Sequence, residues 1–156
     1  MECLKKLYGI LVCVGNKLQC PVLLLVRLAW GWQFFEAGKG KLEDIQKPIG
    51  FFTELHIPLP KLSAYMAGST ECFGGLLLML GLGSRLVSIP LAFTMVVAYL
   101  TAHIDTVKTI FSKPDDFLGA PPFPFLIAVL IILAFGPGKI SLDGAIDQFY
   151  LRRKND

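Results

Sequence analysis

The stretch APPFPFLIAVLIILAFGPG, residues 120–138, contains no ionisable side chain. The hydrocarbon core of a bilayer is about 30 Å thick, and a helix needs roughly 20 predominantly apolar residues to cross it. The length and composition of this stretch therefore predict a membrane-spanning helix. Its early prolines are compatible with that prediction, because the first turn of a helix has backbone N–H groups without partners inside the helix.

Three further apolar runs precede this stretch, so the chain is predicted to be all-α, an integral membrane four-helix bundle. The spans are expected at about residues 20–38, 62–83, 86–104 and 120–137. Hydrophobic residues make up 54% of the chain, which exceeds the usual share in a soluble domain. The connections are too short to hold a second folded domain, so residues 20–138 are expected to form one bundle.

The segments on both sides of the bundle have the pattern of amphipathic surface helices. Residues 1–19 repeat apolar side chains at helical spacing, which predicts a helix lying on the membrane, with a turn at Gln19-Cys20-Pro21 into the first span. Residues 139–156 begin with a capping Ser141 and with Asp143 in the first turn, and they end in a basic tail (Arg152, Arg153 and Lys154). The 42–61 connection mixes aromatic and charged residues, which favours an interfacial helix.

The distribution of charge predicts the orientation and excludes one class of function. An even number of spans places both termini on the same side. That side carries more Lys and Arg than the other, so the positive-inside rule predicts a multi-pass protein with both termini cytoplasmic. The net charge is only +3 and the basic residues are spread along the chain, which argues against nucleic-acid binding.

No phosphate-binding glycine loop or Ser-His-Asp order is present, which argues against nucleotide-binding and hydrolase functions.

Several motifs occur together in an order typical of one known family. They are Arg27-Leu28, Phe34-x-x-x-Gly38-x-x-Lys41, Glu71-x-x-Gly74-Gly75, Gly81-Leu82-x-x-Arg85 and Gly136-Pro137-Gly138-Lys139-x-Ser141-Leu142-Asp143. From about Leu24 to Ile146 the sequence resembles the DoxX family of small four-helix bacterial membrane proteins. Members often carry a histidine before the glycine that closes the first span, whereas this chain reads Glu36-Ala37-Gly38. No role of that histidine can be carried over.

The resemblance implies a protein of the bacterial inner (plasma) membrane. Some relatives are described as subunits of quinone-linked or sulfur-oxidising oxidoreductase systems. The expected function is therefore that of an accessory subunit of a membrane oxidoreductase system, with a membrane or periplasmic redox protein as partner and quinone as the implied cofactor. Whether the chain is itself an enzyme, and whether it forms a homo-oligomer, stays open. The alternative is a non-enzymatic membrane scaffold or chaperone that recruits partners through the 42–61 loop.

Two ionisable residues inside the predicted spans are the first candidate site. Helix rise places Glu71 roughly 14 Å from the outer surface and Arg27 about 10 Å from the inner end of its span. The resulting difference in depth, about 6 Å, can be bridged by a long arginine, so a buried Arg27–Glu71 pair is predicted. The pair is interpreted either as a staple that fixes the packing of two spans or as a catalytic site where Glu71 exchanges a proton with a bound quinol.

A second polar cluster is expected at the outer ends of the spans. It would combine Glu36, Lys41, His103 and Asp105. Its histidine could bind a ligand, although charge also concentrates at span ends simply because they are solvated. The spacing of these residues does not demand a metal, so no metal site is assigned. Trp30 and His103 are further candidates for cofactor contact, because an indole can stack on a quinone ring; such an aromatic also packs against helices or lipid.

Overall fold

The computed structural model describes the backbone of residues 2–155 and the side chains of residues 6–147 and 149. Throughout this range the regular elements are helices, so the predicted all-α class is confirmed. The helices are α1 (Glu2–Glu43), α2 (Gln46–Glu54), α3 (Pro60–Leu80), α4 (Ser84–Ala102), α5 (Ile104–Lys108), α6 (Pro114–Leu118), α7 (Pro122–Phe135) and α8 (Leu142–Asn155).

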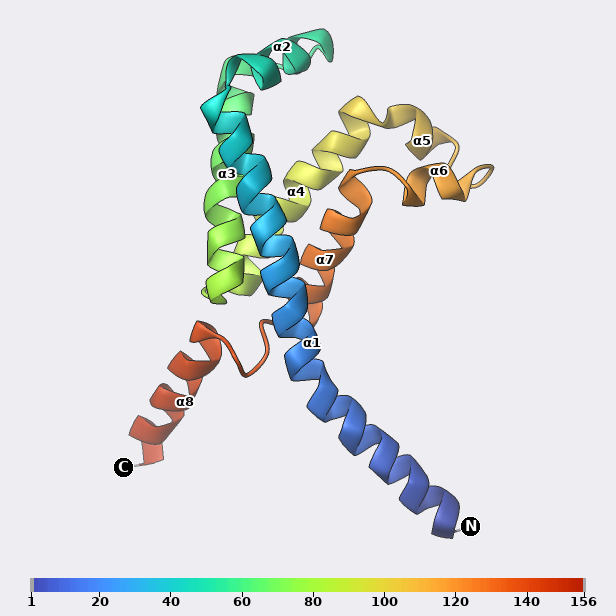
Figure 1. Cartoon of the computed structure of the whole chain (residues 1–156), viewed down its shortest axis with the longest axis vertical. Helices are drawn as coiled ribbons and strands as arrows, with labels where there is room; N and C mark the ends of the chain where they lie inside the picture. Colours follow the sequence, from blue (N-terminus) through green and yellow to red (C-terminus); the bar gives the residue numbers. More distant parts are fainter. Residues whose placement is uncertain (1, 156) are drawn as a thin grey trace.

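Helices α1, α3, α4 and α7 pack together and form the body of the molecule (Figure 1). Helix α1 lies against α3, α3 against α4, and α4 against α7, while α1 also touches α7. All four contribute to one buried apolar cluster, which consists of Phe34, Leu78, Leu91, Met95, Val129 and Ile132. This packing places the polar residues of α1 and α3 at the contact between these two helices.

Glycines allow α1 and α3 to approach closely. A Cβ atom added to Gly75 of α3 would lie 2.5 Å from the backbone nitrogen of Phe35 and 2.6 Å from the carbonyl oxygen of Gly31, both on α1. These distances leave no room for a side chain. Small residues at a helix contact are typical of proteins in membranes, where association depends on close van der Waals packing.

Helix α1 continues through the predicted turn at Gln19-Cys20-Pro21, so that part of the prediction is wrong. Pro21 lies inside the helix. A proline removes one backbone hydrogen bond, but apolar residues on both sides continue the helix, and membrane helices tolerate proline more readily than soluble ones. At about 1.5 Å per residue, α1 is about 63 Å long, roughly twice the thickness of the hydrocarbon core. The surface location of residues 1–19 stays a prediction.

Two helices of the described part of the chain are long and apolar enough to cross a membrane. They are Lys6–Glu43, within α1, and α4 (Ser84–Ala102). Helix α7 is apolar, but it begins and ends two residues inside the predicted span of 120–137. The structure therefore supports two candidate membrane helices, and the arrangement with four spans stays a prediction.

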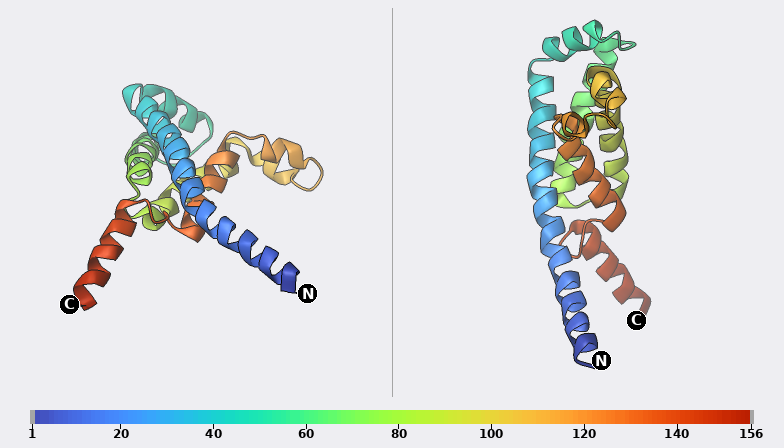
Figure 2. Two further views of the ribbon diagram at one scale, coloured as in Figure 1. Left: turned by 60° about the horizontal axis from the view of Figure 1, so that its bottom comes forward. Right: turned by 90° about the vertical axis from the view of Figure 1, so that its right-hand side faces the viewer.

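The two ends of the chain lie at the same end of the molecule (Figures 1 and 2). Helix α2 covers the opposite end, within the 42–61 connection where a helix was expected, and α5 and α6 project sideways near the same end. Helix α8 forms within residues 139–156, as predicted. The side chains of its basic tail, Arg152, Arg153 and Lys154, lie outside the described residues.

Candidate functional site

Arg27 and Glu71 are both buried, but they do not form the predicted pair. The exposed fraction is 1% for Arg27 and 3% for Glu71. Arg27 lies level with Leu78, to whose carbonyl it donates, and Leu78 is seven residues, or about 10 Å, along α3 from Glu71. The depth estimate from sequence misjudged how the two antiparallel helices are aligned. Each charged group therefore finds a different partner.

Arg27 donates hydrogen bonds to backbone carbonyls from two parts of the chain. Its Nε atom donates to the oxygen of Leu78 at 3.0 Å, and Nη2 donates to the oxygen of Met79 at 3.2 Å. Its Nη1 atom donates to the oxygen of Pro137 and, at 3.0 Å, to that of Ile140. The last carbonyls of a helix lack partners within it, and a cation at that end is electrostatically favoured. Arg27 thus ties the end of α3 to the segment between α7 and α8.

Asp143, which opens α8, completes this junction from the other side. Its carboxylate accepts hydrogen bonds from the backbone nitrogens of Gly83 at 2.7 Å and Ser84 at 3.0 Å, and these lie at the start of α4. Its own backbone nitrogen donates to the oxygen of Gly81 at 3.0 Å. An acidic group at a helix N-terminus is stabilising. Together, Arg27 and Asp143 form what we call the terminal clamp, which holds the α3–α4 hairpin against the start of α8.

The conformation of the hairpin depends on glycine at one position of this clamp. Gly81 has a φ of +71°, in the left-handed region that other residues rarely adopt. A Cβ atom there would also lie 2.6 Å from Nη2 of Arg27. The close approach of the guanidinium and the turn of the hairpin therefore require the same residue.

Glu71 pairs with Lys41, which lies in the last turn of α1. The side chain of Lys41 is 33% exposed, in contrast to that of Glu71 at 3%. The helices are tightly packed beside the pair, since a Cβ atom at Gly38 would lie 2.7 Å from the Cα atom of Cys72. The carboxylate is thus shielded by the two helices, and Lys41 connects it to the surface at the end opposite the termini.

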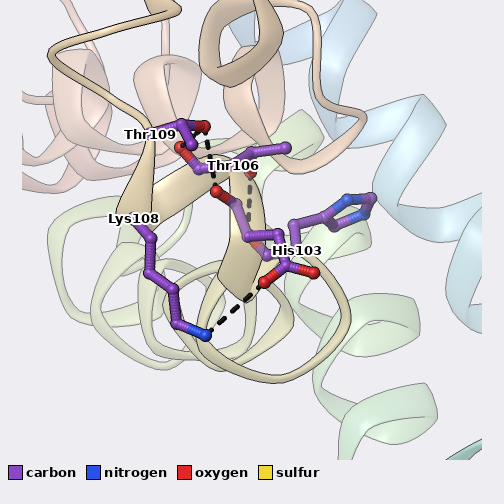
Figure 3. Close-up of polar contacts among 5 residues, drawn as sticks. His103, Thr106, Lys108 and Thr109 are labelled. Atoms are coloured by element: carbon purple, nitrogen blue, oxygen red, sulfur yellow. Dashed lines mark hydrogen bonds and ion pairs between the residues drawn. The ribbon is translucent and has the colours of Figure 1, made fainter.

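The predicted outer cluster does not assemble. Lys41 is engaged with Glu71, and Glu36 is exposed. Asp105 instead forms an ion pair with Lys108 at 3.5 Å, one turn further along the chain. The imidazole of His103 points away from Lys108 (Figure 3) and lies 6.2 Å from the ring of Tyr99, centroid to centroid. The residues at the end of α4 are therefore joined mainly by local contacts.

Trp30, the other candidate for cofactor contact, packs edge-on against Phe125 of α7 with 5.2 Å between ring centroids. Phe34 contacts the same ring at 4.8 Å. The indole is half-buried in this contact. Its position matches the packing interpretation that the sequence left open, and it lies on a different contact from the Lys41–Glu71 pair.

Sequence reasoning missed the role of Lys41 at the buried carboxylate. One signal was available: Gly38 and Lys41 are three residues apart, so they share a helix face, and that face carries the glycine of the close helix contact. The acceptors of Arg27 left no such signal, because backbone carbonyls are present at every residue.

Comparisons with known proteins give one family and three relatives. The model of the DoxX family matches residues 22–104. A Bacillus subtilis protein, provisionally named oxidoreductase CatD, is 29% identical over 133 residues, which cover 85% of this chain and 90% of that protein. An uncharacterised membrane protein of Mycobacterium tuberculosis is 29% identical over 140 residues, covering 82% and 83%. An uncharacterised Haemophilus influenzae protein is 28% identical over 134 residues, covering 82% and 85%. No solved structure matches the chain with significance.

Proposed function

Because this chain belongs to the DoxX family of membrane proteins, we propose that it is an accessory subunit of a quinone-linked oxidoreductase system in the bacterial inner membrane. The observation that carries the proposal is the buried carboxylate of Glu71, which is paired with the partly exposed Lys41. An ionisable group inside a membrane segment is expensive and commonly marks a path for protons or substrate. The name of the Bacillus subtilis relative supports a redox setting.

We place α1, α3, α4 and α7 across the bilayer, with both termini in the cytoplasm. Lys17 and Lys41 lie on α1 about 36 Å apart, which exceeds the hydrocarbon thickness of about 30 Å by only a few ångströms. Each lysine would therefore reach one membrane surface. Helix α7 is about 21 Å long, and a short span of this kind is accommodated by local thinning of the bilayer.

The residues present fit a quinone at Lys41–Glu71 and not at Arg27. The donors of Arg27 face backbone carbonyls and the side chain is buried, so Arg27 is not placed to bind a quinone. A quinone, when bound, takes up electrons together with protons. The ammonium group of Lys41 can donate to a carbonyl oxygen, and Glu71 can hold or release a proton beside it. Because the helices are closely packed, the approach is from the side of Lys41.

The test separates a proton role from a packing role. Replacing one member of a buried ion pair leaves the other charge buried without a partner, which destabilises the protein. Replacing both with apolar residues is often neutral for stability. The double variant Lys41→Met/Glu71→Leu should therefore keep its unfolding temperature in detergent. If the pair serves the reaction, the co-purified complex should reduce quinone at least about tenfold more slowly, which corresponds to about 1.4 kcal/mol in the barrier.

A matched control lies on the same helix. Lys39 and Glu43 form an exposed pair at 3.6 Å, and Lys39→Met/Glu43→Leu removes the same charges there. This control should retain both stability and turnover. Normal quinone reduction by Lys41→Met/Glu71→Leu would reject the proton role and leave the pair as a staple between α1 and α3.

The scaffold function remains a second candidate because of the surface of α2. None of its residues is buried, and Phe51 of α2 and Leu59 of the following loop are exposed. A scaffold would lose its co-purifying partners when Phe51→Ser and Leu59→Ser are combined. Partners that persist in this variant while quinone turnover depends on Glu71 would favour the oxidoreductase subunit instead.

A further inference from the structure

A wide cleft opens at the end of the molecule that holds both termini. It has a volume of about 1390 Å³ and lies between the first half of α1, the α3–α4 hairpin and the segment that leads into α8. Helices α1 and α8 both contribute lining residues, and they diverge from one another towards the ends of the chain (Figure 2). Pockets for small molecules usually measure about 300–1,000 Å³. The cleft is thus large enough for a bulkier ligand.

Cationic side chains from three separate segments line this cleft. Lys17 comes from α1, Arg85 from the start of α4 and Lys139 from the segment before α8. Two acidic residues are also present. The carboxylates of Asp143 and Asp147 oppose the three cations, and that of Asp143 is already hydrogen-bonded to the backbone nitrogens at the start of α4. The cleft therefore carries a net positive charge and favours an anion.

The walls between these cations are apolar. They include four exposed hydrophobic side chains, namely Val12, Leu86, Phe135 and Ile146. Exposed hydrophobic surface beside a group of cations suits a ligand that has an anionic head and an apolar body. A free phosphate would leave these walls uncovered.

We infer that the cleft binds an anionic phospholipid, with its phosphate near Lys17, Arg85 and Lys139 and its acyl chains along Leu86 and Phe135, which belong to the proposed spans α4 and α7. The inference rests on the membrane placement proposed above, in which Lys17 marks the cytoplasmic surface. The leaflet on that side is negatively charged, and basic pockets between membrane helices bind lipid head groups there. Quinone plays no part in this binding, so the inference stands or fails separately from the redox role.

The experiment titrates the purified full-length chain, in a neutral detergent, with phosphatidylglycerol or phosphatidylcholine and counts bound lipid by native mass spectrometry. The variant Lys17→Gln/Lys139→Gln changes two exposed side chains that have no role in the terminal clamp. Each cation near a charged lipid is worth about fivefold in affinity, so the variant should bind phosphatidylglycerol about 25-fold more weakly. Its binding of phosphatidylcholine should not change.

The control Lys61→Gln/Lys113→Gln removes two exposed lysines from the opposite end of the molecule. It should bind phosphatidylglycerol as the unmodified chain does. Equal losses in the two double variants, or no loss in the cleft variant, would overturn the inference. Displacement of the lipid by glycerol 3-phosphate at matched concentration would identify a soluble phosphate ligand and overturn it as well. A lipid-free dimer in which the cleft is occupied by the second copy would also be contrary to it.

Discussion

Replacing Arg27 with methionine tests the terminal clamp, because it removes the donor of four hydrogen bonds while keeping a long side chain. The carbonyls of Met79, Pro137 and Ile140 would lose their donor, whereas that of Leu78 keeps the backbone nitrogen of Gly81 at 3.1 Å. A buried polar group left unsatisfied costs about 1–3 kcal/mol. Taking the lower end for each of these three carbonyls, we expect a loss of about 3 kcal/mol.

This loss is large compared with the usual stability of a folded protein, about 5–15 kcal/mol. For a chain of this length, 1 kcal/mol shifts the unfolding temperature by roughly 2–4 °C, so we expect a decrease of about 6–12 °C. Intrinsic tryptophan fluorescence in one neutral detergent measures it, since Trp30 packs on the same helices. Trypsin should also cut faster after Lys139, because the segment between α7 and α8 is no longer held.

Arg85→Met is the matched control for this change. It removes the same charge near the same hairpin, but its one hydrogen bond, to the oxygen of Ala134, is long at 3.4 Å and exposed. We expect a loss below about 1 kcal/mol. If Arg27→Met unfolds within about 3 °C of the unmodified chain, or at the same temperature as Arg85→Met, the terminal clamp does not stabilise the fold as argued.

Three further changes probe other contacts. Gly75→Ala should destabilise the protein by about 1–3 kcal/mol because its Cβ atom meets the backbone of α1, whereas Gly40→Ala, with open space around it, should be neutral or slightly stabilising in the same unfolding assay. Asp143→Ala should lower the free energy of unfolding by about 1–2 kcal/mol, because α4 loses its N-terminal cap. Equal unfolding temperatures for Asp143→Ala and Asp147→Ala would contradict that role. Tyr99→Phe removes the hydrogen bond of 2.8 Å from the Tyr99 hydroxyl to the Phe117 carbonyl in α6. Amide exchange in α6, measured by hydrogen exchange with mass spectrometry, should become severalfold faster. Unchanged exchange would show that this bond does not hold α6.

The hydrophobic runs predicted which segments form helices, because helix length and apolar content are local properties of the sequence. They also predicted that Arg27 and Glu71 are buried, since both lie inside such runs. The hydropathy pattern does not determine how one helix is aligned along another. A shift of about seven residues, or two helical turns, between α1 and α3 would bring Arg27 level with Glu71 in place of Lys41, and the hydropathy of the sequence is the same in both arrangements.

Two other features could not be predicted from the sequence, for different reasons. A lysine near the end of a span usually reaches water, so Lys41 was assigned to a solvated cluster rather than to a buried carboxylate. Pro21 was interpreted as a break because proline usually ends a helix, yet the helix continues where its neighbours remain apolar. In both cases the surrounding packing, which the sequence does not state, overrides the local preference.

The length of α1 has a mechanical consequence. Arg27 anchors this helix close to its middle, about 32 Å from Lys6 and about 21 Å from Lys41. Between Arg27 and Lys41 the helix is fixed against α3 by the close contacts at Gly31 and Gly38, whereas a Cβ atom placed at Gly9 or Gly15 would meet nothing within 4 Å. A partner that grips the beginning of α1 would thus bend the first half of the helix and leave the contact between Lys41 and Glu71 in place.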